Sequence, residues 1–202
     1  MVIASLSQVR EATNALVAAA RRSGAAVVLV GHVTKDGGLA GPRVLEHTVD
    51  TVMHFEGDRD GALRLLRVIK HRFGATDRVG MFRMTKRGIE SLDDPSGLLL
   101  ADRQAGVPGS AVVAVLEGHR PVLVEVQALV SPRPAGSGGF GTRTVTGLVP
   151  RRIDLILAVL AQRAQLDLSA ADVFVSVAGG LTVREPAADL AIAAAVVSSA
   201  TL

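Results

Sequence analysis

An unbroken apolar run, Ala25–Val30, follows directly on a segment with helical periodicity and most constrains how this chain can fold. The helical segment begins near Ser7, which can cap a helix, and stops at Gly24. A continuous apolar run after a helix is typical of a strand that is buried on both faces of a mainly parallel sheet. The sequence therefore predicts an α/β fold, with a helix up to residue 23 and a buried strand over 25–30.

Both helix and strand signals are found along the rest of the chain. Strands are predicted over 51–56, 62–70, 79–85, 110–116, 121–130 and 171–177, and helices over 44–48, 150–165 and 186–200. Leu92–Gly97 has the composition of a linker, and Ser131–Gly141 is rich in Pro, Gly and Ser. We therefore expect two domains, residues 1–93 and 94–202, each of which mixes α and β structure.

Composition restricts the kinds of site that the chain can carry. Cysteine is absent, which excludes disulfides and thiolate metal sites in this stretch. The apolar segment Ala187–Leu202 is short and contains Asp189, so it predicts a buried helix rather than a membrane span. The net charge is only +3, and the pI of about 10.1 is high because neither Cys nor Tyr titrates between the histidines and the lysines. We expect a cytoplasmic protein with no membrane partner, whose affinity for nucleic acid depends on where its cations lie.

Three segments, in order along the chain, carry a resemblance to a known family. The first is GHVTKDGGLAGPRVLEH at 31–47, and the second is KHRFG at 70–74. The third runs from 109–113 through 121–132 to 177–180 and 185–191. Together they resemble the RadA/Sms family of bacterial DNA repair proteins, whose hallmark motif is Lys-Asn-Arg-Phe-Gly. The resemblance implies the C-terminal portion of a RecA-like P-loop ATPase sheet over 1–93 and a truncated α+β Lon-protease-like domain over 94–202.

The same resemblance implies a function. It points to a DNA-dependent ATPase that drives branch migration during homologous recombination and DNA repair, with ATP and Mg²⁺ as cofactors. The implied partners are single-stranded and branched DNA, identical subunits in a hexameric ring, and a RecA-type recombinase. Family members also carry an N-terminal zinc finger and a P-loop, and this chain has neither cysteine nor a P-loop match. On its own, the chain is therefore expected to be inactive.

The KHRFG segment holds the strongest candidate residues. Lys70 and Arg72 are two apart on a predicted strand end, so their side chains point to the same side. By resemblance, both reach across a subunit interface to the γ-phosphate that a neighbour holds, where positive charge stabilises the transition state. His71 stands where the family has Asn, Phe73 is expected to anchor the turn, and Gly74 permits a tight backbone. The alternative is an ordinary basic strand end.

The polar, glycine-rich segment 31–42 holds a second group of candidates. His32 follows the predicted buried strand and resembles the sensor that couples the γ-phosphate to a DNA-binding loop; the alternative is a histidine that bonds a neighbouring backbone group. Lys35 and Arg43 bracket the glycines, and such a segment can lie close to a phosphate backbone. By resemblance they contact DNA, and the alternative is a solvated loop.

The segment 185–191 resembles the nucleophile region of Lon proteases. Ala187 stands at the position of the catalytic serine and Asp189 at that of a glycine. Because alanine has no oxygen that can attack a carbonyl, the position is degenerate and no acyl-enzyme forms. Arg143, Arg151 and Arg152 are candidates for a basic DNA-facing surface, although a solvated helix start is the simpler interpretation of the last two.

Two other functions remain open from the sequence. One is a Lon-like ATP-dependent protease subunit, against which Ala187 argues directly. The other is a non-catalytic scaffold for ring assembly and DNA binding. No metal site is predicted, because His47 and His54, with Asp50 and Glu56 nearby, read as scattered side chains around a strand rather than as ligands.

Overall fold

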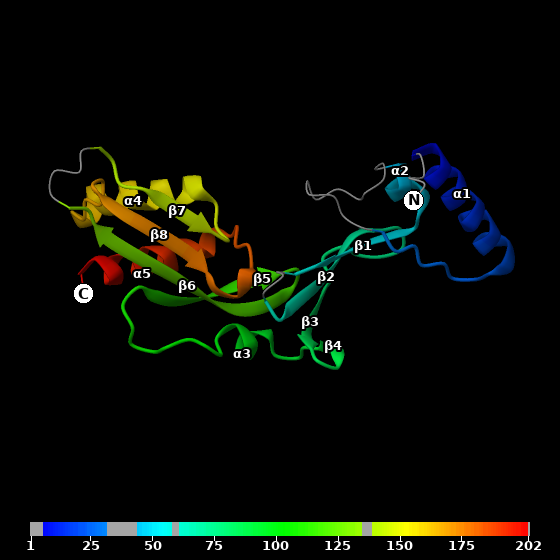
Figure 1. The fold of residues 1–202 in the computed structure, drawn as a ribbon, viewed down its shortest axis with the longest axis horizontal. Helices are drawn as coiled ribbons and strands as arrows, with labels where there is room; N and C mark the ends of the chain where they lie inside the picture. Colours follow the sequence, from blue (N-terminus) through cyan, green and yellow to red (C-terminus); the bar gives the residue numbers. More distant parts are fainter. Residues whose placement is uncertain (1–5, 32–43, 58–60, 135–138, 202) are drawn as a thin grey trace. The chain divides into compact units, whose positions relative to one another are not determined.

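The computed structural model describes residues 6–31, 44–57, 61–134 and 139–201, and the statements below concern these ranges (Figure 1). The chain forms two compact units, Met1–Phe55 with Leu66–Arg78, and Glu56–Leu65 with Val79–Leu202. Helices and two four-stranded sheets are mixed, so the α/β class is confirmed at that level. The boundaries of these units differ from those of the predicted domains 1–93 and 94–202. The two domains stay a prediction.

Helix α1 (Leu6–Ser23) and the short helix α2 (Val44–Thr48) belong to the first unit. Both were predicted, and α1 ends at Gly24, whose φ is 72°. Ser7 lies inside the first turn of α1, because the helix already begins at Leu6. The prediction that Ser7 caps this helix is therefore wrong.

The apolar run Ala25–Val30 forms no strand in the structure. Its side chains are exposed, with 85% of Val28 and 93% of Val30 accessible to solvent. The prediction of a buried parallel strand is therefore wrong for this structure. The physical reason is that such a run needs neighbouring strands and a layer on each face, and the described part of the chain places no strand beside it.

Four strands form the first sheet in chain order. They are β1 (Thr51–Glu56), β2 (Leu63–His71), β3 (Val79–Thr85) and β4 (Gly88–Ser91). β3 and β4 are antiparallel, with Thr85 opposite Gly88. The first three strands confirm the predictions within one residue at each end. β4 was missed because four residues are too few for a periodicity signal.

The predicted linker Leu92–Gly97 is a structured segment. Helix α3 (Pro95–Leu99) starts within it, and the Asp94 side chain caps the helix by accepting a hydrogen bond from the Gly97 backbone N at 3.1 Å. Pro95 and Leu99 are both buried. The linker interpretation is wrong, because Asp-Pro is also a helix start when apolar residues follow it.

The second sheet supplies most of the core of the second unit (Figure 1). Its strands are β5 (Ser110–Glu117), β6 (Arg120–Pro132), β7 (Arg143–Thr146) and β8 (Ala171–Val177), in the order β5-β6-β8-β7. Neighbours are antiparallel except β7 and β8, which are parallel. β7 was not predicted, and the other three confirm the sequence analysis.

Two helices pack against one face of this sheet. α4 (Pro150–Ala164) and α5 (Asp189–Thr201) contact each other, and short 3-10 turns at Ala178–Gly180 and Pro186–Ala188 connect β8 to α5. The fully buried side chains at this interface are Val122, Val124, Val126, Val173, Ile153, Ile192 and Val196. Both helices were predicted, and none of the described helices is long and apolar enough to cross a membrane.

Candidate functional site

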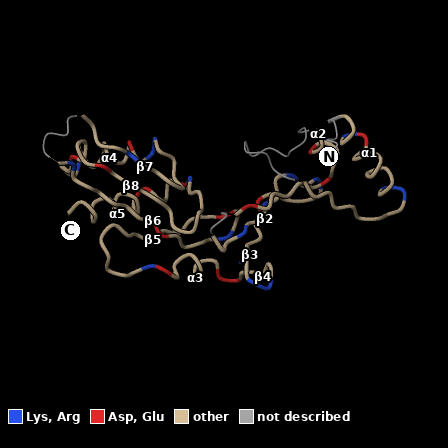
Figure 2. The backbone as a smooth tube through the Cα atoms, in the orientation of Figure 1, with Lys and Arg blue, Asp and Glu red and all other residues tan. Residues whose placement is uncertain are grey.

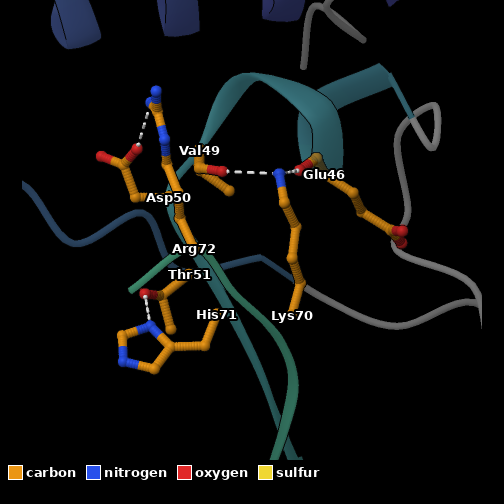
Figure 3. Close-up of polar contacts among 7 residues, drawn as sticks. All are labelled: Glu46, Val49, Asp50, Thr51, Lys70, His71 and Arg72. Atoms are coloured by element: carbon orange, nitrogen blue, oxygen red, sulfur yellow. Dashed lines mark hydrogen bonds and ion pairs between the residues drawn. The ribbon is translucent and has the colours of Figure 1, made fainter. Parts of the chain in front are cut away.

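The basic residues of the KHRFG segment lie at the end of β2, beside the C-terminal end of α2 (Figure 3). The backbone N of Arg72 donates to the Asp50 carbonyl at 2.9 Å, which fixes the strand end against the residue that precedes β1. The side chains of Lys70 and Arg72 extend toward the α2 turn, whereas His71 points the other way (Figure 3). This is the alternation that an extended strand imposes.

Lys70 is bound within its own unit. Its Nζ donates to the carbonyl oxygens of Glu46 and Val49, at 2.6 and 2.9 Å. The last carbonyls of a helix have no partner inside the helix, and a cation at this end also interacts favourably with the helix dipole. Lys70 therefore closes the C-terminal end of α2 and ties it to β2.

Arg72 is held much more weakly. Its side chain is 61% exposed, and its Nη1 lies 3.2 Å from Oδ1 of Asp50, which is itself 47% exposed. Exposed ion pairs of this kind contribute about 0–1 kcal/mol. The guanidinium also lies 5.6 Å from the ring centroid of Phe73. Arg72 can therefore exchange Asp50 for another anion at little cost in free energy.

Phe73 does not anchor the turn in a core, contrary to the prediction. Its side chain is 76% exposed, and the contact that the structure records for it is the one with the Arg72 guanidinium. The turn is fixed instead by backbone pairing and by His71, whose Nδ1 lies 2.9 Å from Oγ1 of Thr51. The His71 ring also packs closely against Gly74, since a Cβ at position 74 would lie 2.7 Å from the imidazole Cδ2. Glycine is needed here for the close approach of the imidazole.

Asp50 and Thr51 contact this segment, and neither contact was predicted from the sequence. Asp50 had been considered only for a metal site, and no three His, Asp or Glu side chains of the described ranges gather as metal ligands. The available signal was the pairing of two consecutive predicted strands. That pairing places Asp50 and Thr51 opposite Arg72 and His71.

The other predicted nucleotide and DNA residues cannot be placed in the same way. His32, Lys35 and Arg43 all lie outside the described residues. The structure therefore brings together Lys70 and Arg72 but gives no position for the proposed sensor and DNA loop.

Ala187, which was predicted to be a degenerate nucleophile position, lies at a helix start. Ala187 is exposed in the 3-10 turn Pro186–Ala188, directly before α5. Next to it, Asp189 accepts two hydrogen bonds from Arg152 of α4, one from Nε and one from Nη2 at 2.8 Å. The bond from Arg152 thus occupies the carboxylate that stands where Lon proteases have glycine.

Two of the three arginines suggested for a basic surface are engaged inside the chain. Arg143 donates to the carbonyl oxygens of Leu168 and Thr142, at 2.8 and 3.1 Å. Arg152 is paired with Asp189, whose hydrogen bond raises the pKa of the guanidinium. Arg151 is exposed. Arg151 is therefore the best placed of the three to contact a partner.

Comparison with known proteins gives a consistent result. No family model matches the chain. The DNA repair protein RadA of Halalkalibacterium halodurans is 49% identical over 195 residues, which are 96% of this chain and 42% of that protein. RadA of Brucella abortus is 50% identical over 195 residues, 96% of this chain and 41% of that protein. RadA of Pseudomonas aeruginosa is 50% identical over 194 residues, 96% of this chain and 42% of that protein.

The mixed α/β fold and the basic strand end thus lie in a chain whose relatives are DNA repair proteins. The chain belongs to the RadA family. It spans about two fifths of the length of the curated relatives it matches, at 41–42%.

Proposed function

We propose that this chain is part of a DNA repair ATPase in which Arg72 supplies positive charge to a nucleotide that a neighbouring subunit holds. The observation that carries the proposal is the exposed guanidinium at the end of β2, whose ion-pair partner among the described residues is a half-exposed carboxylate. An arginine in this state can move to a phosphate without leaving a buried charge behind. The names of the relatives support the DNA repair context.

The two cations of the motif fit a phosphate group unequally. Arg72 presents a planar fork of N–H donors, which suits phosphate oxygens, and it would give up only one surface ion pair. Lys70 would have to leave two backbone carbonyls at the end of α2. We therefore assign Arg72 the direct contact, and we assign Lys70 the task of positioning α2 and the strand end.

Bound ATP with Mg²⁺ would supply the phosphoryl group whose transfer to water drives the motor. The residues of this chain would add charge from outside the neighbour's site: the guanidinium of Arg72 would neutralise charge that develops on the γ-phosphate oxygens. Hydrolysis would then require that subunits assemble, in keeping with a hexameric ring.

The same proposal gives the remaining predicted residues their roles. Lys35 and Arg43 contact the backbone of single-stranded or branched DNA, and His32 relays the state of the nucleotide to them. Coupling of this kind would drive branch migration beside a RecA-type recombinase. Replacing Lys35 and Arg43 should then lower DNA affinity and weaken its dependence on salt.

We further propose that the second unit is a Lon-like domain without protease activity. The exposed helix start at Ala187 supports this, because the position is accessible but has no nucleophilic oxygen. The ion pair between Arg152 and Asp189 fills the adjacent position with a structural contact. Casein digestion tests this proposal, and cleavage that survives removal of contaminating proteases would contradict it.

The ATPase proposal is tested by DNA-stimulated ATP hydrolysis in a protein of full RadA length that contains this chain. The variants are Arg72→Ala, Arg72→Lys and Asp50→Asn, and ring assembly is measured separately by light scattering. Asp50→Asn is the matched control, because it removes the same surface ion pair and leaves the guanidinium in place.

We expect Arg72→Ala to assemble normally and to lose about 10³-fold or more in hydrolysis, as arginines that act in trans do. Arg72→Lys should recover only part of the rate, since a point charge replaces the fork. Asp50→Asn should keep the rate. If Arg72→Ala hydrolyses ATP at the normal rate, or if Asp50→Asn loses as much as Arg72→Ala, the trans-acting role is wrong.

A further inference from the structure

The hairpin of β3 and β4 carries a concentration of positive charge that the roles above do not use. Lys86 and Arg87 form its two-residue turn, between the paired residues Thr85 and Gly88. Arg83 adds a third cation on β3, and Glu90 is the one carboxylate of the hairpin. In Figure 2, the blue of Lys and Arg marks the turn that joins the two strands.

The turn cations are exposed and available. In the described ranges, no side-chain hydrogen bond or ion pair is found for Lys86 or Arg87. The Glu90 carboxylate lies instead 3.8 Å from Arg83 and accepts a hydrogen bond from the Thr85 hydroxyl at 3.1 Å. Glu90 is therefore engaged along the strands, and the charge at the tip is not neutralised by it.

The hairpin also holds its tip in a defined geometry. The Thr85 Oγ1 accepts a hydrogen bond from the Arg87 backbone N at 3.1 Å and lies 3.0 Å from the Gly88 carbonyl. Gly88 has a φ of 115°, which a residue with a side chain rarely adopts. At the other end of β3, Met81 is 2% exposed in the core of the second unit. The backbone of the turn is thus held above a buried base, and it presents both cations at one exposed point.

We propose that this hairpin tip is a contact site for the phosphodiester backbone of DNA, in addition to the contacts proposed for Lys35 and Arg43. The proposal rests on the DNA binding that the proposed function includes. Two adjacent exposed cations at a hairpin tip can contact neighbouring phosphates, and contacts of this kind are independent of base sequence. The tip adds affinity and orientation rather than sequence recognition.

The face of the hairpin opposite Arg83 favours a rival partner. Met84 and Ile89 are paired across the strands there, and they are 41% and 51% exposed. An exposed apolar pair is also found at protein contacts. We favour nucleic acid as the partner because the two cations at the tip are not neutralised. A protein contact through the apolar pair would not require them.

The test is DNA affinity of the 202-residue chain, measured by fluorescence anisotropy with single-stranded and duplex 40-mers between 50 and 200 mM salt. The variant is Lys86→Gln together with Arg87→Gln, which removes both charges, keeps polar side chains and leaves the Arg87 backbone N able to donate to Thr85 Oγ1. The matched control is Arg21→Gln together with Arg22→Gln, an adjacent exposed pair at the end of α1 that removes the same charge. Thermal unfolding checks that both variants fold.

We expect the hairpin variant to bind about tenfold more weakly at 100 mM salt and to reduce the slope of log K against log salt by about 1.5. The control should change both quantities much less. The two DNA substrates show whether the site prefers the single strand or the duplex.

Three results would overturn the proposal. Equal losses in hairpin variant and control would mean that only net charge matters. Unchanged DNA affinity of the hairpin variant would mean that the hairpin does not contact DNA. No measurable binding of DNA by the unmodified chain would overturn this site, whereas the DNA binding in the proposed function is tested separately by replacing Lys35 and Arg43 in a protein of full RadA length.

Discussion

Arg152 of α4 and Asp189 at the start of α5 form a two-pronged ion pair, with Nη2 donating to Oδ2 at 2.8 Å and Nε donating to the other carboxylate oxygen. The pair joins two helices that cover the same face of the second sheet. Asp189 also lies in the first turn of α5, where a negative charge favours the helix dipole. The Asp189 carboxylate therefore holds α4 against α5 and also stabilises the start of α5.

Replacing Asp189 with Ala should lower the unfolding temperature more than replacing Arg152 with Ala. Both changes break the ion pair, and Asp189→Ala also removes the favourable charge at the start of α5. We expect Asp189→Ala to lower Tm by about 3 °C, as measured by differential scanning calorimetry. Arg151→Ala, the exposed neighbour on α4, is the control and should leave Tm unchanged. Equal effects of Arg151→Ala and Arg152→Ala would contradict a role for the pair.

Lys70→Met should loosen α2 without affecting the second unit. The Met side chain keeps the apolar stem and removes the donor that binds the Glu46 and Val49 carbonyls. We expect a loss of about 1–2 kcal/mol in the free energy of unfolding and faster amide hydrogen exchange over 44–49. Arg72→Met is the control, since its surface ion pair contributes less. Unchanged exchange in α2 would show that Lys70 does not hold the helix end.

The sequence predicted the elements whose patterns are local. The helix with the Ile153 and Ile156 stripe, and the strand over 171–177, depend on their own periodicity and were found at the expected residues. Ala25–Val30 has a pattern that only neighbouring strands can satisfy, and the described chain has none beside it. Asp94 and Pro95 led to a linker prediction, whereas in the structure they start a helix whose Leu99 is buried.

The positions of the two cations of the site were predictable from the sequence, but the groups that they bind were not. Spacing alone put Lys70 and Arg72 on one side of a strand end, as the structure has them. It could not tell that Lys70 binds helix carbonyls while Arg72 stays exposed, because this depends on how α2 packs against β2. In the proposed function, that difference separates Lys70 as a positioning residue from Arg72 as the residue that contacts the neighbour's nucleotide.

Gly74→Ala should displace the imidazole of His71. The new Cβ would lie 2.7 Å from Cδ2 and 3.0 Å from Nε2, so the ring must move and its hydrogen bond with Thr51 is lost. We expect a loss of about 1 kcal/mol in the free energy of unfolding by urea. In a His71→Ala background, the same change should be neutral or stabilising, because the contact is gone and alanine restricts the unfolded chain. Equal losses in both backgrounds would locate the strain elsewhere.

Asp167 offers a test of pH dependence outside the candidate sites. The backbone N of Ser169 donates to its Oδ1 at 2.8 Å, and this bond, followed by one from the Ser169 side chain, lowers the pKa of the carboxyl. Because the folded pKa lies below the unfolded one, the carboxylate stabilises the fold fully above about pH 3.9. That contribution is lost as the pH falls through the folded pKa.

Carboxyl titration by NMR should therefore place the Asp167 midpoint below that of a peptide spanning residues 165–171. Ser169→Ala should raise the midpoint only in part, because the alanine backbone N still donates and the hydroxyl contribution alone is removed. Ser169→Pro removes the backbone donor as well, so it should bring the midpoint close to the peptide value. A midpoint in the unmodified chain equal to that of the peptide would show that the turn does not hold the carboxylate in solution.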